Sequence, residues 1–109
     1  MIVAKRDLFV LNEGSKVTVQ VSIDAPRFDV SAWIADYSIA WPEGTFKHHG
    51  MGMDSVQALF SALRYIAIHV YASPYHKAGT LLFDTPGGGY GFPLPFDSRD
   101  LAIGLDKTL

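Results

Sequence analysis

One long helix is predicted by the stretch Asp54-Ser55-Val56-Gln57-Ala58-Leu59-Phe60-Ser61-Ala62-Leu63-Arg64-Tyr65-Ile66-Ala67-Ile68-His69-Val70-Tyr71-Ala72-Ser73. Asp54 is a suitable N-cap, and Gln57, three residues later, can complete a capping box. The helix should end at Ser73, because the residue before Pro74 disfavours helical backbone. Apolar residues recur with the spacing of one buried helical face, at Val56, Leu59, Phe60, Leu63, Ile66, Ala67 and Val70.

Four strands are predicted before this helix and one after it. Residues 16–23 alternate polar and apolar, which indicates a half-buried strand. Residues 8–11 should pair with it across a turn at 12–15. A third strand is expected over 32–41, a fourth over 45–49 and a fifth over 80–84. Residues 24–29 are predicted to be a connection, because Pro26 cannot donate a ladder hydrogen bond.

This order, β-β-β-β-α-β, predicts an α+β fold in which one long helix packs on one face of an antiparallel sheet of four to five strands. The odd positions of the third strand form its better core face: Trp33, Ala35, Tyr37, Ile39 and Trp41. Residues 1–109 should form a single domain, with 85–109 as a Gly/Pro-rich C-terminal arm. A short helical turn is expected over 98–101.

The composition excludes several classes of protein. The chain has 109 residues, of which 49% are hydrophobic and 18% charged, and this balance excludes disorder. Without cysteine it has no disulfide, thiolate zinc site or thiol nucleophile. The net charge of −2 and the absence of a basic stripe argue against nucleic-acid binding. The chain has no signal peptide and no apolar run of membrane-spanning length, so we expect a soluble cytoplasmic protein with no membrane contact.

The helix entry carries a family resemblance. It lies in the string Gly52-Met53-Asp54-Ser55-Val56-Gln57-Ala58-Leu59, with Ala62-Leu63 following. This string resembles the Gly-x-Asp-Ser-x-Gln-Ala-Leu helix entry of an uncharacterised family of small bacterial proteins. The resemblance covers roughly residues 6–96. It implies a bacterial source and a four-stranded segment leading into the helix. Because the family is a domain of unknown function, it implies no activity and no catalytic residues.

No local pattern predicts catalysis, a metal or a cofactor. His48 and His49 are adjacent on a strand and point to opposite faces, and His69 and His76 are too far apart for a standard local ligand pair. The glycine loop 87–91 precedes Phe92-Pro93-Leu94-Pro95 and not a helix, so it lacks the context of a phosphate loop. There is no Gly-x-Ser-x-Gly elbow. These features favour a non-enzymatic protein over an enzyme.

Two surfaces are candidates for binding. Trp33, Tyr37 and Trp41 share one strand face and form either core beneath the helix or a surface for a ligand or partner. With His48 and Tyr90 they would line a pocket between sheet and helix.

The second surface is the outer side of the helix, where Tyr65, Ile68 and Tyr71 make the C-terminal half apolar nearly all round. Either the arm, through Phe92, Leu94 and Phe96, or a second subunit should cover it.

Two functions follow from these surfaces. The first is a non-enzymatic binding or interaction module that self-associates as a homodimer or binds a protein partner. The alternative is a small-molecule-binding protein or an enzyme with its pocket between sheet and helix.

Overall fold

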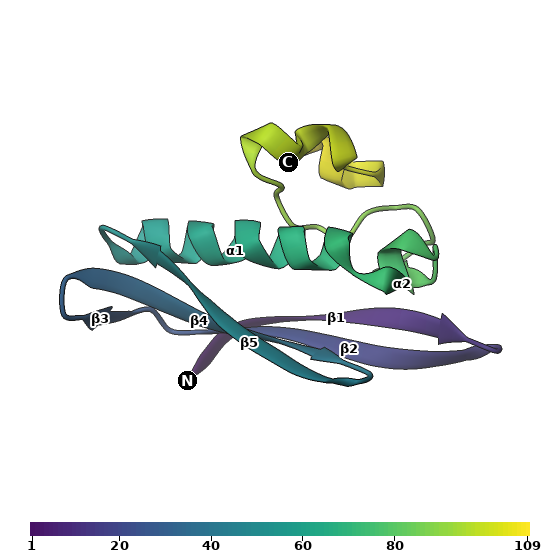
Figure 1. Ribbon diagram of the computed structural model, residues 1–109, viewed down its shortest axis with the longest axis horizontal. Coiled ribbons are helices and arrows are strands. Elements are labelled where there is room, and N and C mark those ends of the chain that lie inside the picture. Colours follow the sequence, from purple (N-terminus) through teal and green to yellow (C-terminus); the bar gives the residue numbers. More distant parts are fainter.

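A computed structural model describes all residues from 1 to 109. Figure 1 shows helix α1 lying along one face of a twisted sheet, with the C-terminal segments on the side of α1 away from the sheet. The elements in chain order are β1 (Ile2–Asn12), β2 (Ser15–Asp24), β3 (Arg27–Asp29), β4 (Ala32–Trp41), β5 (Gly44–Gly52), α1 (Ser55–Ala72), α2 (Pro74–Lys77), β6 (Leu81–Leu82), and the 3-10 helices η1 (Phe96–Leu101) and η2 (Gly104–Thr108).

The α+β class and the antiparallel sheet are as predicted, but the sheet has six strands and not four to five. β5 pairs with one side of β4, and the sheet continues from the other side of β4 through β2 and β1 to β6. The extra strand, β3, follows Pro26 and pairs with the first residues of β4. Pro26 therefore separates β2 from β3 without ending the sheet, and the register against β4 slips by one residue between them.

The closest contact between α1 and the sheet lies at β5. A side-chain carbon on Gly50 would overlap the backbone of Ala58 and Ala62, and one on Gly52 would overlap the backbone of Ala58. Only residues of this size allow backbone to approach backbone so closely. Ala58 and Ala62 are fully buried, and they therefore form the tightest part of the helix–sheet contact.

The helix buries the predicted face only in part. Ile66, Ala67 and Val70 are buried, and Leu59 and Leu63 pack against the core. Val56 and Phe60, predicted to be core residues, are 70% and 47% exposed. The buried helix residues are Ala58, Ala62, Ile66, Ala67, Val70 and Tyr71. The small residues turn toward β5, which rotates Val56 and Phe60 to the flank of the helix. The predicted core face of β4 is confirmed, since Ala35, Tyr37 and Ile39 are buried and Trp33 and Trp41 pack against the same core.

The C-terminal arm completes the core beside α1. Tyr90, Phe92 and Leu94 alternate along the arm and are all buried in the main core, together with residues of β1 and β2. Arg6 of β1 donates from its guanidinium to the carbonyl oxygens of Tyr90 and Gly91, at 3.1 and 2.9 Å. The core face of the sheet is thus shared between a helix and an extended arm. No helix has the length and apolar character that a membrane span requires.

We predict that Gly50→Ala lowers the free energy of unfolding by about 1–3 kcal/mol, the usual cost of overpacking. The added methyl group must push α1 away from β5. Chemical denaturation measures the change. Met51→Ala is the matched control, because the Met51 side chain is half exposed, and it should change stability by only about 0.5 kcal/mol. Equal effects of the two substitutions would contradict the close contact.

The N-cap of α1 gives a second prediction. Asp54 Oδ1 accepts from the backbone N–H of Gln57 at 2.8 Å, and Gln57 Oε1 accepts from the backbone N–H of Met53 at 2.6 Å. Asp54→Ala should therefore lower the unfolding free energy by about 1 kcal/mol. Asp54→Ser should keep most of the stability that the cap contributes, because serine is also a good N-cap residue. Thermal or urea unfolding of the two variants tests this, and equal losses would argue against the cap.

Candidate functional site

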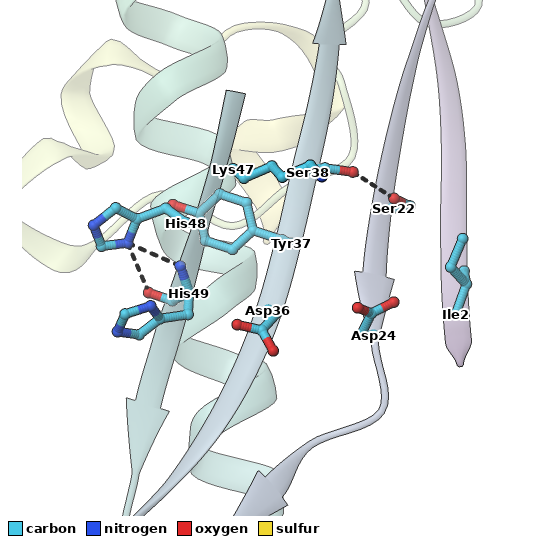
Figure 2. Close-up of a pocket in the computed structure, with 9 residues that line it drawn as sticks. All are labelled: Ile2, Ser22, Asp24, Asp36, Tyr37, Ser38, Lys47, His48 and His49. Carbon is cyan, nitrogen blue, oxygen red and sulfur yellow. Dashed lines mark hydrogen bonds between the residues drawn. The ribbon is translucent and has the colours of Figure 1, made fainter. Parts of the chain in front are cut away.

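The face of the sheet opposite α1 is open and carries a polar concavity of about 520 Å³. Figure 2 shows its lining, with β2 and β4 joined by a contact of 2.7 Å between the hydroxyl groups of Ser22 and Ser38. Asp24, Asp36 and His49 also line it. Such polar residues are typical of the solvated face of an antiparallel sheet.

The charges of this open face are only partly paired. Arg27 Nε donates to Asp36 Oδ2 at 2.9 Å, and its guanidinium also lies 3.3 Å from Asp29. Hydrogen bonding to Asp36 raises the pKa of Arg27, which keeps it charged. At the neighbouring edge strand, His48 Nδ1 accepts from the backbone N–H of His49 at 2.8 Å. The open face therefore offers hydrogen-bonding groups, some exposed and others half-buried.

The residues predicted to line a pocket between sheet and helix do not come together. Trp33 packs edge-on against Phe28 at the start of β4, whereas Trp41 stacks on Tyr75 at its other end. Tyr90 lies on the arm. Only Tyr37 and His48 are neighbours, with ring centroids 6.3 Å apart.

A cluster of rings surrounds Tyr37 where α1 meets β4 and β5. The side chains of Phe46, His48 and His69 pack around one another, with Phe46 and His69 only 4.4 Å apart between ring centroids. The Tyr37 hydroxyl is buried without a hydrogen-bond partner. Burial, assisted by Tyr65, raises the pKa of Tyr37 to about 12. Burial and then the nearby His48 lower the pKa of His69. Burial therefore favours the uncharged forms of Tyr37 and His69.

A second cluster ties the arm to the C-terminal half of α1. Asp106 is 2% exposed and accepts three hydrogen bonds, from the Tyr71 hydroxyl at 2.6 Å and from the backbone N–H groups of Tyr90 and Gly91 at 2.9 and 2.7 Å. Burial raises the pKa of Tyr71, and its hydrogen bond to Asp106 adds to the increase. Of the predicted interface residues, Tyr71 is thus covered by the chain itself, while Tyr65 and Ile68 are 47% and 37% exposed.

Asp106 was not identified from the sequence. It lies in a tail without periodicity, and no spacing relates it to Tyr71, 35 residues earlier. The only sequence signal for a close contact in this region is the presence of the glycines near Asp106. A side-chain carbon on Gly89 would meet the Asp106 carboxylate, and one on Gly104 would meet the backbone of Gly88. The glycine loop is therefore needed for close packing of the tail.

Exposed large apolar residues gather at the end of the sheet where α1 begins. Phe28 and Trp33 form a cross-strand pair, Trp33 pairs with Gly52, and Gly52 contacts the first turn of α1. Figure 1 shows the β3–β4 turn and the start of α1 at the same end of the molecule. We call this end of the molecule the apolar end. Its exposed apolar residues, all at least 47% exposed, are Phe28, Val30, Met51, Met53, Val56 and Phe60.

The fold and these surfaces define a small α+β domain with one open sheet face and one apolar end. The chain belongs to the family described as Domain of unknown function (DUF6968), whose model matches residues 4–94. The match covers the sheet from residue 4 onward, α1 and the first part of the arm, and it ends before η1. No curated protein and no solved structure matches the chain.

The ring cluster predicts acid sensitivity. Because the folded-state pKa of His69 lies below its ordinary value of 6.5, the unfolded chain binds the proton first. The free energy of unfolding should therefore be unaffected by this group above that value and fall as pH decreases through it. His76 contributes in the same direction, because burial lowers its pKa too.

Urea unfolding at about pH 5 and about pH 7.5 measures this effect. His69→Gln should reduce the loss of stability on acidification, whereas His49→Gln, on the open face, should retain the wild-type loss. A His69→Gln variant as acid-sensitive as the wild type would contradict the assignment.

Proposed function

We propose that the protein is a non-enzymatic interaction module that forms a homodimer through its apolar end. The observation that carries this proposal is the exposure of Met53 and Val56, at 90% and 70%, at the end of the molecule where Phe28 and Phe60 are also exposed, at 60% and 47%. Exposed apolar side chains gathered in one region are characteristic of protein interaction sites. Its position at the rigid junction of β5 and α1 favours a preformed surface.

The charges around the apolar end favour a second copy over a charged partner. Arg27 is paired with Asp29 and Asp36, and Asp54 is bonded as the helix cap. The guanidinium of Arg64 lies over the Phe60 ring at 4.5 Å from the centroid. Since these charges are satisfied within the chain, the surface is best matched by another apolar surface. A twofold axis would supply one, and twofold dimers are the commonest homo-oligomers.

The turn at Val30 supports the same conclusion. Val30 has φ of 59°, a left-handed backbone that a β-branched residue adopts only with strain. Its side chain is 92% exposed, so packing within the chain does not stabilise it there. Glycine or asparagine would relieve the strain, and an apolar residue at this tip is therefore better explained by a contact with another molecule.

We also propose a bacterial source and a cytoplasmic location. The helix entry from Gly52 to Leu59 supports the first, because it resembles that of small bacterial proteins. The cysteine-free composition supports the second, since it suits a reducing compartment.

Sedimentation velocity tests the dimer. The wild-type chain should sediment as a dimer at high concentration, and Val56→Lys should shift it to a monomer, because a dimer would bury two unpaired ammonium groups. Leu105→Lys is the matched control, with a similarly exposed leucine outside the apolar end, and should leave the dimer intact. A wild-type monomer at every concentration, or equal effects of the two substitutions, would exclude the proposed interface.

A further inference from the structure

A separate pocket of about 390 Å³ lies between the C-terminal half of α1, α2 and the tail. Its apolar walls come from Ile68 of α1, Leu94 of the arm and Leu101 of η1. Its polar lining consists of His76, Lys77 and Ser98. An apolar pocket with a few polar groups at one side is the usual form of a small-molecule site, and this volume lies within the usual range.

His76 is held in a defined orientation at this pocket. Its Nδ1 lies 2.6 Å from the Tyr90 hydroxyl, and its ring packs against Tyr71 with centroids 4.7 Å apart. The alternative acceptor for the Tyr90 hydroxyl, the Leu81 carbonyl oxygen, is 3.5 Å away. When the Tyr90 hydroxyl donates to Nδ1, the neutral ring carries its own proton on Nε2. In that tautomer His76 presents an N–H donor on the side away from Tyr90.

The other polar groups of the pocket are also donors. Lys77 makes no ion pair within the chain, and no carboxylate lines the pocket. The Ser98 hydroxyl has one long contact, 3.5 Å to Asp97 Oδ1, and can turn to another acceptor. A preoriented imidazole N–H beside a free ammonium group is complementary to an anion that accepts several hydrogen bonds.

We propose that this pocket binds a small monocarboxylate with an apolar body. The carboxylate accepts from His76 Nε2 and is paired with the Lys77 ammonium group. The apolar body packs against Ile68, Leu94 and Leu101. This site is independent of the apolar end, which involves the opposite half of α1.

The tail makes the site particular to chains that carry it. Ser98 and Leu101 lie beyond residue 94, where the family match ends. Asp106 holds this segment on α1 through its hydrogen bonds to Tyr71, Tyr90 and Gly91. Bound carboxylate should therefore stabilise the docking of the tail as well as the fold.

Titration with 3-phenylpropionate, followed by two-dimensional NMR of the full chain, tests the proposal, with 3-phenylpropionamide as the uncharged isostere. The carboxylate should shift the backbone amide signals of His76, Lys77 and Leu101, and the amide should bind roughly tenfold more weakly. Lys77→Gln should weaken carboxylate binding by a similar factor, while Lys107→Gln, at the exposed tail, should not.

Three results would overturn the site: no shifts at millimolar carboxylate, shifts confined to other residues, or equal affinity for carboxylate and amide. Lys77 is exposed, so Lys77→Gln should fold normally, and its unchanged thermal midpoint without ligand provides the check. His76→Gln offers a second variant, since its amide keeps an N–H donor but loses the bond to Tyr90. It should bind more weakly than the wild type and more tightly than His76→Ala.

Discussion

Direct contact between the backbones of α1 and β5 determines how the rest of the chain is arranged. Gly50 and Gly52 have no side chain to separate the helix from the strand, and Ala58 and Ala62 add only a methyl group each. The helix therefore packs chiefly over β4 and β5. The core face of β1 and β2 is left for another segment, and the arm fills it with Tyr90, Phe92 and Leu94.

The same geometry explains why one flank of the helix is covered and the other is not. Toward its C-terminal end, α1 meets the tail, where the buried Asp106 carboxylate bonds to Tyr71. Toward its N-terminal end the tail makes no such contact, and Val56 and Phe60 remain exposed. The helix thus has more apolar residues than one buried face requires, and different contacts explain them in its two halves. The tail covers one part, and a second copy of the chain is proposed to cover the other.

The sequence predicted the local elements better than their contacts. The α1 bounds and strand 32–41 follow from apolar period, capping and Pro74, all of which act within a few residues. The sequence does not predict β3, because Pro26 cannot donate a ladder hydrogen bond and so indicates an end of pairing. Pairing with β4 nevertheless resumes at Arg27, with the register shifted by one residue. Periodicity places Val56 and Phe60 in the core, because it identifies an apolar face of the helix. It does not show that the side of the helix with Ala58 and Ala62 packs against Gly50 of β5. The Asp106 contacts depend on tertiary packing that no local pattern records.

The apolar end is proposed to be the surface at which two copies of the chain meet. The most direct measurement is an isotope-filtered NOE experiment on a mixture of labelled and unlabelled chains at high concentration. A dimer joined at the apolar end should give intermolecular contacts at the methyl groups of Val30, Met53 and Val56. Intermolecular contacts centred on Tyr65 and Ile68, or none at any concentration, would contradict it.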